Sequence, residues 1–315
     1  MKAPDTSGTS GTLIILPRLL QRRLEKAASQ FISEGNAFSV DFAHPPGEAA
    51  LVPADSISWR IFKNPVALFL GGIAAVLLEL AEPKVRSGVW GHTNFRSAPL
   101  RRMQRTGFAA MVTVYGARSA AEEMIRHVGR MHASISGITP DGRAYRADDP
   151  ALLSWVYATA SFGFIEAYHA YVRRLAPEDF SRFYTEGQAA AGLYGARCTI
   201  GSRPEMAALL DQMGGALEPS SILFEFLDII ENVPVLPSPL YRLQPMLVRA
   251  AVELVPPALR ARLGLSQHWS LRPWQRGVVA RLGALSDRVL LTSSPAVQAC
   301  RRIGLPDGYL YRSAG

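Results

Sequence analysis

The 315-residue chain has only two cysteines, and only four of its 34 basic residues are lysine. Cys198 and Cys300 are too few for a disulfide scaffold or for a cysteine-rich metal or iron–sulfur site. Unpaired cysteines suit a reducing compartment, and we expect the protein to be cytoplasmic. Alternating runs of valine, isoleucine and threonine are scarce, so the sequence predicts no sheet larger than a short pair of strands.

Long hydrophobic runs are also absent. The longest apolar run extends from Pro65 to Leu78 and ends at Glu79. Its length of about 14 residues falls short of the ~20 that cross a bilayer, so we predict a buried central helix. The first 12 residues are small and polar, and we expect a tail there without a signal peptide.

Arginine supplies the remaining 30 basic residues and gives the chain a net charge of +8. Such an excess fits either an anionic ligand, which arginine binds bidentately, or the codon bias of a GC-rich genome. The arginines are dispersed, without a helix-turn-helix or an aromatic–basic platform, which argues against a nucleic-acid partner. A basic surface is compatible with peripheral contact to an anionic membrane.

Turn and capping residues divide the chain into helices. Asn64-Pro65 and Asp149-Pro150 are typical helix starts, and Ser119 with Glu122 predicts a capping box. The predicted fold class is all-α, with a single multi-helix domain at 36–305, an N-terminal tail and peripheral helix at 1–35 and a C-terminal tail at 306–315. The predicted helices are 64–81, 99–115, 119–136, 149–174, 177–194, 204–214, 220–231, 239–254, 256–263, 272–285 and 295–302.

Two of the six histidines lie in one predicted helix. His132 continues an apolar stripe with Ile125, Val128 and Ile135, whereas His127 lies about 140° away around the helix. A buried imidazole needs either a hydrogen-bond partner or a metal ion, so spacing alone leaves both interpretations of His132 open.

A cationic stripe occupies the preceding helix. Arg102, Arg105, Thr106 and Ala109 follow the spacing of one helix face, which is either a solvated basic face or a binding surface. Trp155 belongs to an aromatic stripe that we expect to lie in the core. Two further arginines, Arg143 and Arg146, lie on a predicted loop where they could reach an anion.

Several stretches, taken together and in order, resemble the catalytic domain shared by rubber oxygenases (latex clearing proteins) and MpaB-type oxygenases. The resemblance covers about 64–195 and a later segment, and its stretches are GVWGHTNF (88–95), PLRRMQRT (99–106), RMHASISG (130–137), TPDGRAYRADDPALLSWVYAT (139–159), AYHAYVRRLAPEDFSRFYTEG (167–187) and VELVPPALRARLGL (252–265). It implies haem b in a globin-like, all-α core. It also implies an oxygenase that acts with O2 on a hydrophobic, unsaturated, isoprenoid- or lipid-like substrate.

The resemblance also assigns cofactor residues. Met131-His132-Ala133 matches the pattern around the family's proximal iron ligand, so His132 is expected to bind iron. Arg130, Trp155 and His92 lie in the matching stretches, and we assign them to the cofactor site.

Catalytic residues follow from the same resemblance. Arg102, Arg105 and Thr106 match a distal Arg-x-x-Lys-Thr pattern, with arginine in place of lysine. A family glutamate acts as a base, and Glu79 and Glu82 are the candidates; we assign Glu82 to the catalytic set.

Two departures from the family pattern concern supporting residues. Relatives have Ala-His-Pro where this chain has Ala81-Glu82-Pro83, and Trp-Val-His where it has Trp155-Val156-Tyr157. If the family histidines support the pocket, the substrate or the haem state of this chain is expected to differ from that of its relatives.

Two alternatives remain beside the oxygenase. One is a protein that binds haem or a hydrophobic ligand without turnover. The other is a thiolate-haem monooxygenase, suggested by the segment 193–201 around Cys198 but lacking the Glu-x-x-Arg helix of that class. The resemblance leaves room for an electron donor as a partner and does not predict an oligomeric state.

Overall fold

The structure is a computed structural model that describes residues 13–14, 21, 25, 39–197, 200–236, 240–265 and 268–311. It is a mostly helical single domain, as the sequence predicts, with one short antiparallel strand pair. Most of the predicted N-terminal helix, and Cys198, lie outside the described residues.

The described helices and strands follow the predicted order closely. In chain order they are α2 (Ile57–Phe62), α3 (Pro65–Ala81), α4 (Pro83–His92), α5 (Pro99–Tyr115), α6 (Arg118–Ala133), β1 (Ser136–Ile138), β2 (Ala144–Arg146), α7 (Pro150–Tyr171), α8 (Pro177–Glu186), α9 (Gln188–Leu193), α10 (Arg203–Met213), α11 (Ser221–Asn232), the 3-10 turn η1 (Leu240–Leu243), α12 (Gln244–Leu254), α13 (Pro257–Arg262), α14 (Pro273–Ser286), α15 (Pro295–Arg302) and the 3-10 turn η2 (Tyr309–Tyr311).

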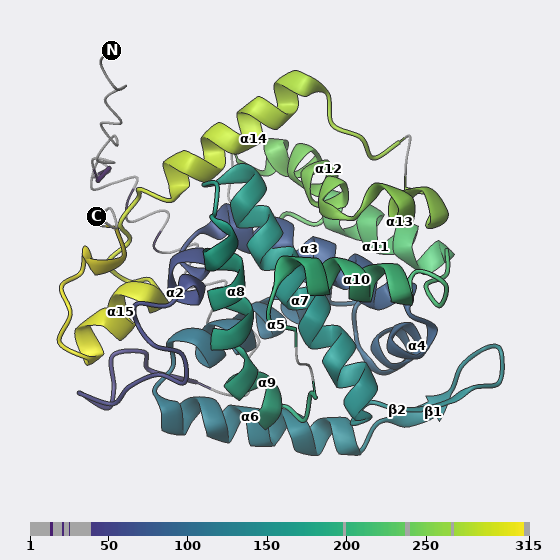
Figure 1. The fold of residues 1–315 in the computed structure, drawn as a ribbon, viewed down its shortest axis with the longest axis horizontal. Helices are drawn as coiled ribbons and strands as arrows, with labels where there is room; N and C mark the ends of the chain where they lie inside the picture. The colour runs from purple at the N-terminus through teal and green to yellow at the C-terminus, as the bar shows by residue number, and fades with distance from the viewer. Residues whose placement is uncertain are drawn as a thin grey trace, which may run out of the picture.

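The centre of the molecule is the pair α3 and α7, around which the other helices are arranged (Figure 1). Asn64 caps α3 by accepting a hydrogen bond from the Ala67 amide, and Pro65 fills the first turn. The two helices approach closely because glycines meet at their crossing. A Cβ at Gly71 would lie 2.7 Å from the Phe164 Cα, and a Cβ at Gly163 would overlap the carbonyl oxygen of Gly71.

We expect Gly163→Ala to destabilise the protein by at least about 2 kcal/mol, because its methyl group has no room between the two backbones. Gly277→Ala is the matched control, since a Cβ at this helical glycine meets nothing within 4 Å. That change should be neutral or stabilising by up to about 1 kcal/mol. Urea unfolding of the three proteins measures both values, and equal stability of Gly163→Ala and wild type would contradict the close crossing.

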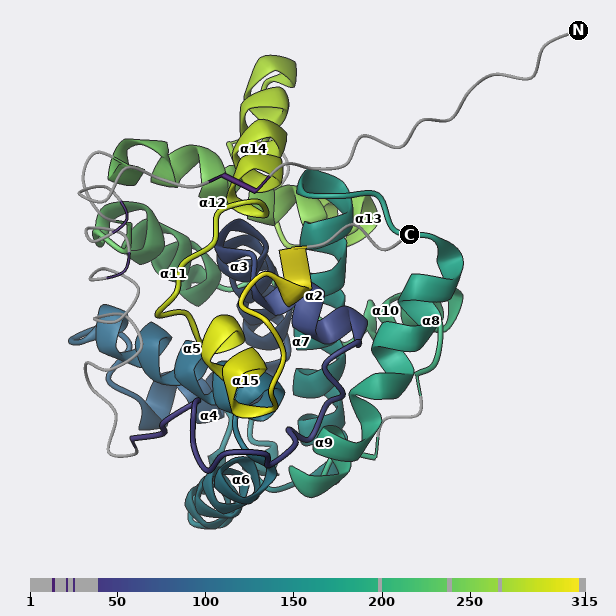
Figure 2. The same cartoon turned by 90° about the vertical axis from the view of Figure 1, so that its left-hand side faces the viewer.

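The outer helices lie on opposite sides of this core. α6 lies along one edge and α14 along the opposite edge (Figures 1 and 2). The β1–β2 hairpin projects beyond α4 (Figure 1). The C-terminal region packs onto the body through the buried Arg302, which donates hydrogen bonds to the carbonyl oxygens of Phe42, Glu48 and Tyr115. Residues in the predicted C-terminal tail also pack, since Leu310 is buried and the Tyr311 ring contacts Lys63.

The structure corrects the predicted start of α6. Ser119 is not its N-cap, because the helix begins at Arg118 and has no side-chain cap. The Ser119 amide and hydroxyl instead donate to the Glu48 carboxylate, at 2.6 and 3.0 Å. A tertiary contact has taken the place of the expected local one.

Other segments also differ from prediction. The helix predicted at 119–136 ends at Ala133, and Ser136 begins β1. The chain bends by 108° after α3 and continues as α4, a helix that the sequence did not predict. Within the described residues no single helix is long and apolar enough to cross a membrane. The bent pair α3–α4 reaches the required length and apolar composition when its two helices are taken together. The helix predicted at 177–194 is divided into α8 and α9 at Gly187, where a Cβ would overlap the hydroxyl of Tyr157.

Candidate active site

The site lies between two helix pairs. α3 packs along α7, and α5 contacts the consecutive helix α6, but no extensive backbone contact joins one pair to the other within residues 39–197. Phe69, Gly72, Val76 and Glu79 share one face of α3 and remain partly exposed, although most of that helix is buried. This face is therefore incompletely covered by protein.

Glu79 is the most perturbed group on that face. Burial raises the pKa of its carboxyl group to about 7, while the positive charge of Arg102 and a hydrogen bond with the Thr159 hydroxyl act in the opposite direction. The influence of Arg102 indicates that the Glu79 face of α3 is directed toward α5. A carboxyl group with this pKa exchanges its proton readily near neutral pH.

Arg102 is the central cation of the site. Burial lowers the pKa of its guanidinium group, Glu79 raises it and Arg105 lowers it. The guanidinium group also hydrogen-bonds the Thr106 hydroxyl one turn further along α5. Arg105, by contrast, is exposed, so the predicted cationic stripe has one inward and one outward arginine.

His132 lies in the last turn of α6 and is half-buried. Burial lowers the pKa of its imidazole, and the charge of Arg102 lowers it further, against a weaker opposite effect of Asp148. Both effects favour the neutral imidazole, which has no hydrogen-bond partner among the described residues. A neutral, unpartnered imidazole nitrogen is the form that binds a metal ion.

The residues present fit a haem group better than a protein-only metal site. No group of three or more histidine, cysteine or carboxylate side chains gathers in the described part of the chain. Haem iron needs only one protein ligand, which His132 offers. Arg102 would supply a cation for an anionic propionate, and the partly exposed Phe69 and Val76 of α3 would supply apolar contacts.

Of the other assigned residues, Trp155 borders this cluster, whereas Glu82, His92 and Arg130 are engaged elsewhere or exposed. Glu82 caps α4, with its carboxylate accepting a hydrogen bond from the Val85 amide at 2.6 Å. Trp155 is buried in the core and donates to the Leu78 carbonyl oxygen. His92 and Arg130 are exposed, and His92 contacts the Tyr145 hydroxyl at 3.1 Å.

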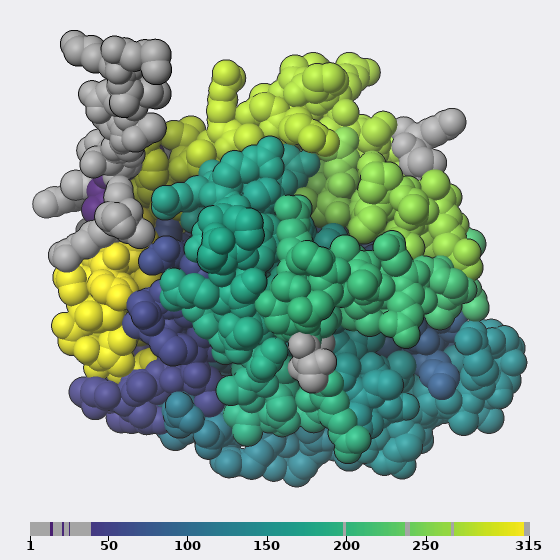
Figure 3. All heavy atoms as spheres, in the orientation of Figure 1, coloured from purple at the N-terminus to yellow at the C-terminus, as the bar shows by residue number. Residues whose placement is uncertain are grey.

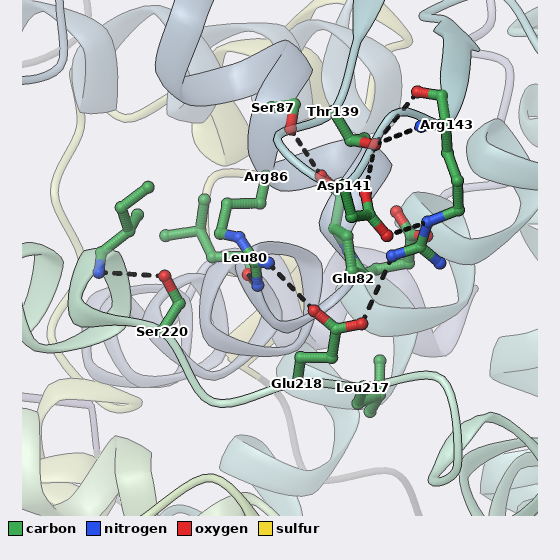
Figure 4. Close-up of polar contacts among 12 residues, drawn as sticks. Leu80, Glu82, Arg86, Ser87, Thr139, Asp141, Arg143, Leu217, Glu218 and Ser220 are labelled. Atoms are coloured by element: carbon green, nitrogen blue, oxygen red, sulfur yellow. Dashed lines mark hydrogen bonds and ion pairs between the residues drawn. The ribbon is translucent and has the colours of Figure 1, made fainter.

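The loop arginines already have carboxylate partners. Arg143 pairs with Asp141 and with Glu218, and Glu218 also pairs with Arg86 of α4, so one carboxylate joins two segments (Figure 4). Arg146 forms a two-point ion pair with Asp148. Both predicted anion-binding arginines are therefore already paired with carboxylates, and Glu218 connects the hairpin loop with α4.

A polar cavity of about 250 Å³ lies at the other end of α7. Four of its charged groups form two ion pairs, Arg203 with Glu166 and Arg276 with Glu253, and Arg174 contacts His169. The buried thiol of Cys300 is a poor metal ligand, because burial raises its pKa to about 11. Both features lie outside the Glu79–Arg102–His132 cluster.

Sequence reasoning missed a second polar pair on the α5 face. Thr113 continues the stripe of Arg102 and Thr106, and its hydroxyl lies 2.9 Å from the hydroxyl of Tyr194. Burial raises the pKa of Tyr194. Helical spacing from Thr106 could have identified Thr113, but nothing in the sequence connects it with Tyr194.

Comparison with curated proteins found no significant match, and comparison with solved structures found none either. Residues 59–287, by contrast, match the family described as the catalytic domain of ER-bound oxygenase mpaB/B' and rubber oxygenase. The match includes α3, α5, α6 and α7, and it extends the resemblance noted in the sequence through the end of α14. The chain therefore belongs to the MpaB and rubber oxygenase catalytic-domain family.

Proposed function

We propose that the protein is a haem b-dependent oxygenase that acts with O2 on a hydrophobic, unsaturated substrate of the isoprenoid or lipid type. Membership of an oxygenase family supports the reaction class. The observation that carries the haem proposal is the neutral, unpartnered His132 beside Arg102.

His132 would hold the haem iron through its imidazole, and Arg102 would bind a propionate or a polar ligand on the iron. When bound, the haem would supply the iron at which O2 is activated. Arg105 is exposed and would act only at the edge of the site.

The substrate would contact the apolar side chains between the helix pairs. Phe69 and Val76 on α3 and Leu152 and Val156 on α7 are partly exposed aliphatic or aromatic groups. A mostly apolar lining with few polar groups is typical of a site for a hydrophobic small molecule.

Glu79 would move the proton in this reaction. Its carboxyl group, with a pKa of about 7, can accept a proton from an activated C–H group and return it at the same pH. We therefore propose Glu79 as the base in place of Glu82, whose carboxylate is occupied in capping α4.

We expect Arg102→Ala to lower O2-dependent turnover at least about tenfold while the protein stays folded and retains haem, because a preorganised cation is lost from the reaction centre. Thr106→Ala should also lower turnover, by a smaller factor. Arg101→Ala, an exposed change on the same helix, is the control. Unchanged turnover in both Arg102→Ala and Thr106→Ala would remove this face of α5 from the mechanism.

Oxygen uptake tests the proposed activity directly. The purified, haem-loaded protein should consume O2 when a polyisoprene oligomer or an unsaturated lipid is added, and an oxygenated product should appear. Haem binding without O2 uptake for any such substrate would favour the alternative, a haem- or hydrophobic-ligand-binding protein without turnover.

A further inference from the structure

Helix α14 carries large apolar residues on both of its long faces, together with arginines on the outer one. Its inner face holds the buried Val279 and Gly283, and Gly283 packs so closely on α7 that a Cβ there would overlap the Tyr171 carbonyl oxygen. A surface helix of a globular protein normally has a polar outer face. The outer face of α14 departs from this rule because it exposes large apolar side chains beside its arginines.

The outer face carries two large exposed apolar residues. Trp274 is 59% exposed and Leu285 is 51% exposed. Because they are 11 residues apart, they point in directions only about 20° apart and lie on one stripe. Val278 and Arg281 fall between them on the same stripe. α14 forms an outer edge of the molecule (Figures 2 and 3), so the stripe faces away from the protein body.

The charge around this stripe is positive. Arg272 and Arg281 are exposed, and neither pairs with a carboxylate among the described residues. The nearby carboxylates are occupied, because Asp287 pairs with the buried Lys63 and Glu253 with Arg276. The surface therefore combines exposed apolar side chains with unpaired cations, Arg281 within the stripe and Arg272 at its N-terminal end.

We propose that the outer face of α14 binds peripherally to an anionic lipid bilayer. Tryptophan favours the membrane–water interface, and Val278 and Leu285 would enter the boundary between headgroups and acyl chains. Arg272 and Arg281 would contact lipid phosphates. A second copy of the chain is a poorer occupant, since a two-fold contact would bring the same cations to both sides of one interface.

Vesicle co-sedimentation tests this proposal without haem or turnover, so its outcome is independent of the oxygenase proposal. Wild-type protein should bind vesicles that contain phosphatidylglycerol and should bind pure phosphatidylcholine far more weakly. Trp274→Ala should weaken binding at least about tenfold. Arg281→Gln should weaken it about fivefold, the factor expected for one interfacial cation.

Two control variants distinguish binding through this face of α14 from attraction by the overall positive charge or by any exposed apolar residue. Ile138→Ala removes the apolar residue at 72% exposure on the hairpin, and Arg126→Gln removes an exposed cation on α6, at the opposite edge. Both should bind like wild type. Equal binding by Trp274→Ala and wild type, or absence of wild-type binding, would overturn the proposal. A dimer in solution that Trp274→Ala dissociates would also overturn it and assign the face to a second copy.

Discussion

His132→Ala should purify as a folded protein that retains less than about a tenth of the wild-type haem, because the only proposed axial ligand is removed. Half-burial and the neighbouring Arg102 keep the imidazole neutral, and no described side chain competes for its nitrogens. Circular dichroism measures folding, and haem extraction measures the bound cofactor.

His127→Ala is the matched control, since His127 lies on the same helix about 140° away. It should keep full haem content and an unchanged spectrum. An unchanged spectrum in His132→Ala, or the reverse result for the two variants, would show that His132 is not the ligand and is simply a core histidine.

Glu79→Gln should lower turnover about a hundredfold or more, because an amide cannot accept the proton. In the wild type, turnover should rise with pH through about 7, as the Glu79 carboxyl group ionises. If Glu82→Gln abolishes turnover while Glu79→Gln does not, the base is Glu82, as the sequence comparison alone suggested.

Glu79→Gln should also make the folded protein more stable than wild type at alkaline pH. The folded-state pKa of Glu79, about 7, lies above its ordinary value of 4.5, so the folded state binds the extra proton between these values. Its contribution to stability is therefore fully present below pH 4.5 and is lost as the pH rises through 7. Urea unfolding should show Glu79→Gln more stable than wild type at pH 8, by on the order of 2 kcal/mol, with a smaller difference at pH 5.

Much of the helical fold is predictable because its boundaries are local. Asn64-Pro65 and Asp149-Pro150 combine a side-chain cap with a proline in the first turn, and both helices begin where predicted. Ser119 shows the limit of such signals. Its hydroxyl bonds Glu48, 71 residues away in the chain, and no local pattern reveals that competitor.

The candidate site was only partly visible in the sequence. Periodicity placed His132 on an inward stripe, and the family motif identified Arg102 and Thr106. In the sequence, Glu79 is only the polar residue that ends an apolar run. Its role depends on which face of α3 meets α5, and the sequence alone does not reveal that contact. Glu82 was assigned instead, although its carboxylate caps the helix that starts at Pro83.

The most direct test of the account is the absorption spectrum of the purified wild-type protein, measured together with its iron content. We predict a Soret band and about one iron per chain, held by a single histidine. No Soret band and no iron, after expression with haem supplementation and after reconstitution with hemin, would contradict the haem assignment and leave His132 without its proposed role.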